Sequence, residues 1–554
     1  MTARYSRLRC SNVFWRMLLF LYLMGLFPMV GLGGIDSLWG SLLSTNVCAQ
    51  TPATFSHALL QQPTSSQESH FLPSHAPWEG RRMRLETLRV QEEYAEQNLV
   101  AREWLPKRPT LQIGAFAQKR GNNREIASLL HPSPTELYKL YSAGEWRDSA
   151  VSYFGALALT YANYGMRRWT KLVTPHLFYP YLALDSTEGR PRTVTGMVSL
   201  GRLQRMEFST FALSVTYCGE RNRVEGPLAH RFAQHQLTLR EGVAIPVGEY
   251  WLSQWGGFEY LLQQDRATTQ TPVRIFRHIG FGLWDLDRTT AETRMDFEAS
   301  SGMVQCGLQF LPKQGAGLLA SLNAAHRWGT TGDVRQRSVA SFVLQELNLL
   351  LGYDYVAGAE RAQCALDASW QNRTGVEQFY DSVGRRGNKK YQLLFSEPTY
   401  KGRYRAYGAR LVYITEHLPW EIGGRLWAGY LIQASEYVRP YSHSLLQRWK
   451  VQTTMHLARR IARHRLSCRI AWSVFTRANE RRELYPHIRE PLRSEFLYPE
   501  LARRLPLQYH LLATLAYAYC FPNGWTLEIA PELGYFRTGS TSQWQGGVTL
   551  VVGK

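Results

Sequence analysis

Acidic and histidine side chains are the first candidates for chemistry in this sequence. Asp285 and Asp287 flank a single leucine and could bind calcium. A calcium loop needs more oxygen ligands at close spacing, so we expect a solvated loop at these positions. His326, His417 and His443 are of the residue type that hydrolases use as a base. Because no nucleophile or acid can be assigned to them, we expect these histidines to lie in loops or at interfaces.

Known catalytic and metal-binding motifs do not occur in the chain. The sequence has no Gly-x-Ser-x-Gly nucleophile elbow, no His-Glu-x-x-His zinc motif and no phosphate-binding loop. The cysteines beyond the N-terminal segment are too widely spaced for a zinc site or a disulfide scaffold: Cys218, Cys306, Cys364, Cys468 and Cys520. We therefore expect a protein that is not an enzyme and that binds neither a metal nor a cofactor.

Basic residues are the strongest compositional bias, with a formal net charge of +20 at pH 7. Several clusters fall between apolar segments: Arg385, Arg386, Lys389 and Lys390; Arg459, Arg460, Arg463 and Arg465; Arg503 and Arg504. One interpretation is solvated loops and rims close to lipid phosphates, where cations are favoured. The alternative is a funnel for anionic solutes or polysaccharide, and the charge serves both. We expect no nucleic-acid partner, because no binding module is present.

The N-terminal residues have the pattern of an export signal. Four arginines between Arg4 and Arg16 precede an apolar run from Met17 to Val30. Small residues close the segment before Gln50, so residues 1–49 are predicted to be a cleaved signal peptide. A lipidated Cys48 and an uncleaved anchor helix are the less favoured alternatives.

The next segment, residues 50–105, differs from the rest of the chain. Residues 50–79 are rich in Ser, Gln, Pro and His without periodicity, which predicts a flexible leader. Residues 80–103 have helical periodicity, with apolar side chains such as Leu85, Leu88 and Leu99 on one face. This predicts a short helix that lies either in the periplasm or as a plug in a barrel mouth.

From residue 106 to residue 554, apolar and polar side chains alternate in segments of strand length. Between Leu466 and Val474 every second residue is apolar, and the positions between them include Ser467 and Ser473. A soluble β-sandwich also alternates, but the export signal, the length and number of the segments, and the flanking Tyr and Trp residues favour a membrane barrel. We predict an all-β fold: a single antiparallel transmembrane β-barrel of about 16 strands, within a range of 14–18.

Turn signals in this region predict which connections are short. Asn523-Gly524 suits a two-residue hairpin turn between strands near 511–521 and 525–536. The segments 371–390, 434–448 and 477–506 are expected to be longer, charged connections that face outward. The final residues, from Val551 to Lys554, lack the terminal aromatic residue that many outer-membrane barrels carry.

Three arginines fall on the polar faces of alternating segments. Arg361, Arg425 and Arg469 each alternate with apolar residues. An arginine facing lipid at mid-membrane would cost roughly 2–4 kcal/mol, so these side chains are predicted to line the lumen. They are our candidate site residues.

A short motif resembles a known family. Residues 179–186 read Tyr-Pro-Tyr-Leu-Ala-Leu-Asp-Ser and precede an alternating pair of segments. This run resembles a family of uncharacterised outer-membrane β-barrels of Gram-negative bacteria, and the layout of most of the chain agrees. The resemblance implies a barrel in the outer membrane, and it implies no substrate or catalytic residue.

Together these observations predict the location and two classes of function. We expect a cell outer-membrane protein in contact with outer-membrane lipid and lipopolysaccharide. The leading hypothesis is a channel or transporter of small solutes, with anions favoured. The alternative is a non-conducting binding or assembly barrel whose partner is another surface protein.

Overall fold

A computed structural model of the protein describes residues 111–121, 135–165, 167–169, 182–225, 228–269, 274–280, 283–289, 294–313, 316–333, 337–383, 390–417, 419–438, 441–483, 506–539 and 541–553. The signal peptide predicted for 1–49 and the leader and helix predicted for 50–105 lie outside these residues. Within the described part, every regular element is a strand. No helix found there is long and apolar enough to cross a membrane.

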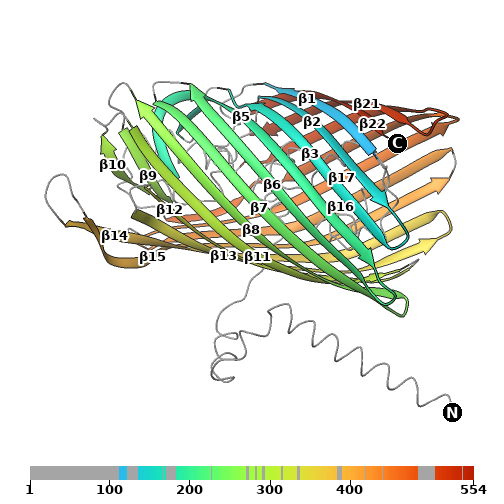
Figure 1. Ribbon diagram of the computed structural model, residues 1–554, viewed down its shortest axis with the longest axis horizontal. Helices are drawn as coiled ribbons and strands as arrows, with labels where there is room; N and C mark the ends of the chain where they lie inside the picture. The colour runs from blue at the N-terminus through green and yellow to red at the C-terminus, as the bar shows by residue number, and fades with distance from the viewer. Residues whose placement is uncertain are drawn as a thin grey trace, which may run out of the picture. The chain divides into compact units, whose positions relative to one another are not determined.

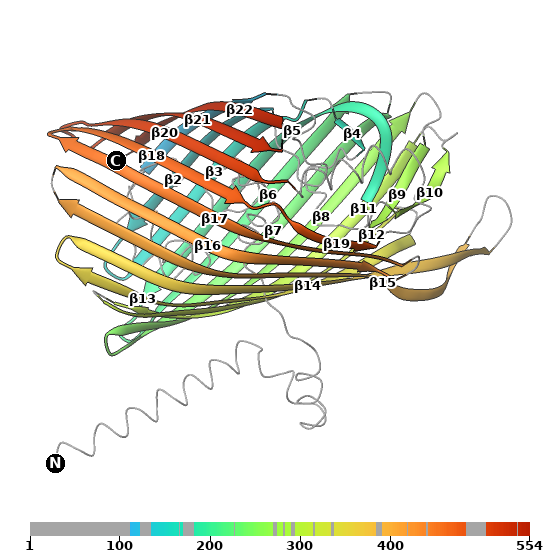
Figure 2. The ribbon, with the colours of Figure 1, turned by 180° about the vertical axis from the view of Figure 1, so that it is seen from behind.

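The chain forms a closed antiparallel barrel (Figures 1 and 2). Its strands are β1 (Leu111–Arg120), β2 (Glu136–Arg147), β3 (Val151–Asn163), β5 (Leu182–Arg205), β6 (Thr210–Glu225), β7 (Leu228–Val247), β8 (Tyr250–Thr269), β11 (Arg294–Pro312), β12 (Gly317–Asp333), β13 (Arg337–Ala357), β14 (Glu360–Val383), β15 (Lys390–His417), β16 (Trp420–Tyr437), β17 (Ser442–Ile461), β18 (His464–Phe475), β20 (Gln508–Cys520), β21 (Thr526–Thr538) and β22 (Thr541–Gly553). Each of these 18 strands pairs with the next, and β22 pairs with β1 to close the ring.

Four short strands lie outside this ring. β4 (Arg167–Trp169) and β9 (Arg274–Gly280) pair with β5, β10 (Leu283–Thr289) pairs with β9, and β19 (Asn479–Glu483) pairs with β17. The barrel has more strands than the 16 expected and matches the upper end of the expected range. The number follows from which strands pair around the ring, and a period-two pattern does not encode pairing.

Alternation along the strands separates an apolar exterior from a polar interior. On β18, Leu466 is 53% exposed, whereas Ser467 and Ser473 on the opposite face are buried. Large apolar side chains are exposed on many strands, including Leu366 at 67% and Leu200 at 64%. Such an apolar belt is stable against lipid, and closure pairs the backbone groups of every strand. The predicted outer-membrane β-barrel is therefore confirmed as a closed antiparallel barrel with a lipid-facing exterior.

Aromatic pairs mark one edge of this belt, toward the end of the barrel at which β14 ends and β15 begins. Trp370 and Tyr407 lie with ring centroids 6.0 Å apart, and Tyr430 and Trp449 lie 5.1 Å apart on the strands that follow. Rings of this kind sit at the level of lipid headgroups. Such girdles give the barrel a defined height in the bilayer.

The two ends of the barrel differ in their connections. The described connections at one end are short, among them Gly248–Glu249, Gly358–Ala359 and residues 521–525, where Gly524 has a φ of 84°. The connection 521–525 is longer than the two-residue turn expected at Asn523-Gly524. Both β1 and β22 have a terminus at this end, since Gln112 is paired with Gly553. Short turns face the periplasm in such barrels.

At the opposite, extracellular end, two of the three predicted long connections are mostly strand. Most of 371–390 and 434–448 is strand rather than loop, because β14, β15, β16 and β17 continue past the aromatic pairs. Outside the membrane both strand faces are solvated, so the alternation that identifies a strand disappears. Of 477–506, the described part contains β19.

Candidate functional site

Basic side chains gather on the inner face of three adjacent strands. Arg425 on β16, Arg448 and Lys450 on β17, and Arg465 and Arg469 on β18 share the face of buried neighbours such as Trp427 and Ser473. We call these five residues the cationic wall. Along the inward positions of β16–β18, all of them described, Glu421 is the one acidic residue. The wall therefore carries a marked excess of positive charge.

Glu421 sits at the periplasmic rim of the cationic wall. Its Oε2 lies 2.7 Å from Arg465 Nη2, and its Oε1 lies 3.0 Å from Arg460 Nη2. One carboxylate thus bridges two guanidinium groups on neighbouring strands. Further into the barrel, the inward positions of these strands hold four cations and no acid: Arg425, Arg448, Lys450 and Arg469.

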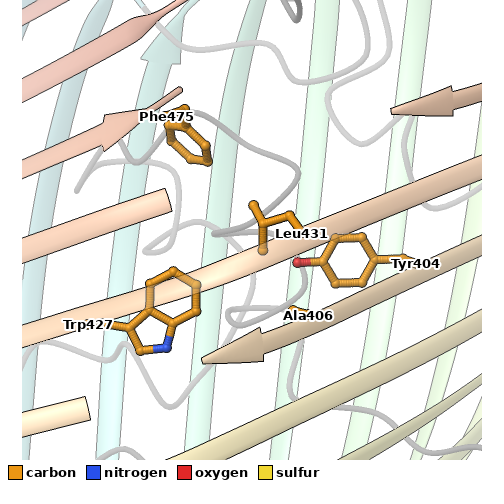
Figure 3. Close-up of a cluster of buried hydrophobic side chains, with 5 residues drawn as sticks. All are labelled: Tyr404, Ala406, Trp427, Leu431 and Phe475. Carbon is orange, nitrogen blue, oxygen red and sulfur yellow. The ribbon is translucent and has the colours of Figure 1, made fainter. Parts of the chain in front are cut away.

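Figure 3 shows a cluster of buried side chains that includes Trp427 of β16 and Phe475 of β18. Trp427, Phe475 and Tyr404 form a buried cluster with Ala406 and Leu431. Lys450 Nζ lies 5.4 Å from the ring centroid of Trp427 and 5.3 Å from that of Phe475. Arg448 Cζ lies 4.4 Å from the centroid of Phe475. Cation–π contacts of this kind hold the side chains of Lys450 and Arg448 in position without neutralising their positive charge.

Trp427 is itself held by a polar contact with β14. Its Nε1 donates a hydrogen bond of 2.9 Å to Asp367 Oδ1, and Arg410 Nε donates one of 3.2 Å to the same oxygen. Arg410 is fully buried, so its charge is compensated by this carboxylate. Asp367 therefore orients the aromatic cluster and neutralises a cation of the next strand.

Elsewhere in the lumen, several charged groups are engaged with partners on nearby strands. Arg327 Nη2 lies 2.7 Å from Glu259 Oε1 across β11. Tyr437 donates a hydrogen bond of 2.6 Å to Glu377 across β15. These contacts brace strands that are not direct neighbours, which is a structural role.

The three arginines predicted from sequence divide into two groups. Arg425 and Arg469 both belong to the cationic wall, two strands apart. Arg361 on β14 also faces inward, but its Nε donates a hydrogen bond of 2.8 Å to Asp354 Oδ1, and a second guanidinium nitrogen pairs with the same carboxylate. Arg361 is thus compensated by an acid of β13.

Three members of the wall, Arg448, Lys450 and Arg465, are absent from that set of candidates, and Arg465 belongs to β18 rather than to the connection expected there. Lys450 alternates with Trp449 and Val451 in the sequence, so the pattern does place it on the polar face. Arg448 falls in a segment expected to be a connection. Only the extended length of β17 identifies it as a lumen residue.

The residues considered for catalysis or metal binding are not brought together. His326 is an exposed residue of β12 beside Trp328, and His443 belongs to β17, five strands further round the barrel. The side chain of His417 and those of Asp285 and Asp287 lie outside the described part, although the two acids belong to β10. Among the described side chains, no group of three or more His, Cys, Asp or Glu is arranged to hold a metal ion.

Comparisons with known proteins give only distant structural similarity. No protein-family model matches the chain, and no curated protein matches its sequence. Among solved structures, BauA, the ferric preacinetobactin receptor of Acinetobacter baumannii, has a TM-score of 0.37 and 8% identity, covering 80% of each chain. The FrpB iron transporter of Neisseria meningitidis has a TM-score of 0.36 and 6% identity, covering 81% of this chain and 82% of its own.

A third similar structure is CdiB of Acinetobacter baumannii. Its TM-score is 0.33 at 11% identity, and the match covers 81% of this chain and 61% of CdiB. At such scores the similarity assigns no ligand to this chain. The resemblance of residues 179–186 to an uncharacterised barrel family stays a prediction.

Proposed function

We propose that this protein is an outer-membrane transport barrel that passes small solutes through its lumen and favours anions. The cationic wall carries this proposal. A barrel interior lined by cations raises the local concentration of anions and lowers the barrier to their passage. The barrel wall excludes most of the surrounding solvent, so these charges act more strongly than they would on an open surface.

Ion selectivity in planar bilayers tests the proposal. The full-length protein is reconstituted under a potassium chloride gradient, and the reversal potential is measured. We expect chloride selectivity, which should weaken when Arg425 and Arg469 are both replaced by Ser. The matched control is Arg459→Ser, because Arg459 lies on the outer face of β17 with its Cζ 5.0 Å from the ring centroid of Trp420. Cation selectivity, or equal selectivity in all three proteins, would contradict anion transport.

A second function is favoured by a different observation. Many inward-facing side chains are buried rather than facing open water: Gln263, Asn323 and Asp354 are 0% exposed, and Arg410 is 1% exposed. We infer that the alternative role is a non-conducting binding or assembly barrel with a surface protein as partner. Absence of conductance in the bilayer experiment, together with a stoichiometric protein in the purified sample, would favour this role over transport.

In either proposed role, the protein is not an enzyme and needs no cofactor. The transport proposal depends on the positive charge of the lumen, and it requires no side chain that reacts with a substrate. A hydrolytic activity of the purified barrel against ester or peptide substrates would contradict it.

A further inference from the structure

Four arginines occupy directly paired positions on four adjacent strands. Arg192 on β5 is paired with Arg223 on β6, Arg223 with Arg231 on β7, and Arg231 with Arg266 on β8. Neighbouring strands lie about 4.8 Å apart, so the row crosses the sheet at close spacing. Alternation requires only that a polar residue stands at each of these four positions, and arginine stands at all of them.

All four side chains lie on the outer face of the barrel. The residues next to them along each strand are buried on the inner face: Thr193, Asn222, Phe232 and Asp265. Alternation therefore points the arginines away from the lumen. They have no part in the selectivity proposed for the interior.

The row lies beyond the apolar belt on the extracellular side. On β6 the exposed side chains run from Leu213 through Val215 to Tyr217 before Arg221 and Arg223 are reached. Tyr217 Oη lies 2.7 Å from His235 Nδ1 of β7, with the two rings stacked, at the edge of this belt. The arginines are thus at the level of the headgroups of the outer leaflet.

Like charges directly opposite each other in a sheet are destabilising. In the described part of the chain, neither Arg223 nor Arg231 forms an ion pair. The outward-facing positions next to the row include two acids: Asp296 on β11 is paired with Arg266, and Glu225 lies two residues beyond Arg223 on β6. An external anion lying across the two central members of the row, Arg223 and Arg231, would reduce the repulsion between them.

We propose that this row, together with Arg221, binds the phosphorylated sugar headgroup of lipopolysaccharide in the outer leaflet. Guanidinium groups match phosphate oxygens through paired hydrogen bonds, and several in line can hold a headgroup with more than one phosphate. The acyl chains would lie along the exposed Leu213, Val215, Leu237 and Leu239 below the row. The site depends on the outer-membrane location and is independent of what passes through the lumen.

Lipid binding by purified full-length protein tests the site. The protein is delipidated in detergent, and its binding of lipid A, dephosphorylated lipid A and phosphatidylglycerol is measured by native mass spectrometry. We expect lipid A to bind the native protein best and its binding to fall several-fold in R223E/R231E. Phosphatidylglycerol and dephosphorylated lipid A should bind weakly to both proteins.

Two controls make the outcome decisive. R202E changes an outward-facing arginine near the periplasmic end of β5 and should leave lipid A binding unchanged. R223Q/R231Q replaces the charges without reversing them, and each variant must keep the gel mobility of a folded barrel. Equal lipid A binding in all variants would overturn the proposal. So would equal binding of phosphatidylglycerol, or displacement of lipid A by millimolar inorganic phosphate.

Discussion

At the scale of single residues, Trp427 occupies its place because two glycines make room for it. Gly408 on β15 is paired with Gly429 on β16. A Cβ atom added to Gly408 would lie 2.7 Å from the indole ring, and one added to Gly429 would lie 2.5 Å from it. Glycine in a strand often marks such a close approach. The indole therefore lies against the backbone, which brings its ring within reach of Lys450.

Replacing Gly429 by Ala tests this packing. The new methyl group would meet both the indole and the carbonyl oxygen of Tyr407, which is 2.7 Å from the ideal Cβ position. Because the backbone cannot yield easily, we expect a loss of about 1–3 kcal/mol in the free energy of unfolding. Urea unfolding in detergent, followed by tryptophan fluorescence, measures it.

Gly424→Ala is the matched control on the same strand. Its nearest contact would be Thr454 O at 3.9 Å, which is an ordinary distance. Equal unfolding midpoints for the two variants would show that the glycine pair is not needed to seat Trp427.

At the scale of elements, β14 and β15 extend beyond the rest of the barrel (Figure 2). β13 pairs with β14 as far as Glu377, and β16 begins to pair with β15 at Tyr400. In the described residues, the strand segments 378–383 and 390–396 pair only with each other. Phe379 and Phe395 stack at 4.5 Å on this arm. The arm adds no pairing to the ring.

We therefore expect the barrel to tolerate removal of the arm. Residues 378–396 can be replaced by Asn-Gly, since Glu377 and Glu397 are paired and this dipeptide suits a two-residue hairpin turn. The shortened protein should still migrate faster before boiling than after it on a denaturing gel. Loss of this mobility difference would mean that the arm contributes to barrel stability.

At the scale of the whole molecule, closure depends on the contact between the first and last strands. β1 and β22 are paired from Gln112–Gly553 to Arg120–Gln545. Without β22, the edges of β1 and β21 would expose unpaired backbone groups to lipid, where each costs several kcal/mol.

Deletion of residues 541–554 should therefore prevent folding into the membrane. We expect the truncated chain to lose the heat-dependent gel mobility and to be absent from the outer-membrane fraction. The arm deletion serves as the control, because it removes a similar number of residues without opening the ring. A truncated chain that still shows both properties would contradict closure through β1 and β22.

The sequence by itself determined the class of this protein. The alternation at Leu466–Val474 and in similar segments follows from one face meeting lipid and the other meeting the lumen, so it can be recognised without a structure. The same rule assigned Arg361, Arg425 and Arg469 to the interior. Turn chemistry located the hairpin at Asn523-Gly524, where Gly524 has the positive φ that favours glycine, although the connection spans residues 521–525 instead of two residues.

Tertiary structure decided what these residues do. The carboxylate of Asp354 neutralises the charge of Arg361, whereas Arg448 and Lys450 belong to the cationic wall together with Arg425 and Arg469. Strand register decides this, because it determines which side chains lie opposite one another. Register also aligned Arg192, Arg223, Arg231 and Arg266, which belong to four different strands. Alternation specifies the face on which a residue lies, but the position of a residue along the neighbouring strand arises only when the ring closes.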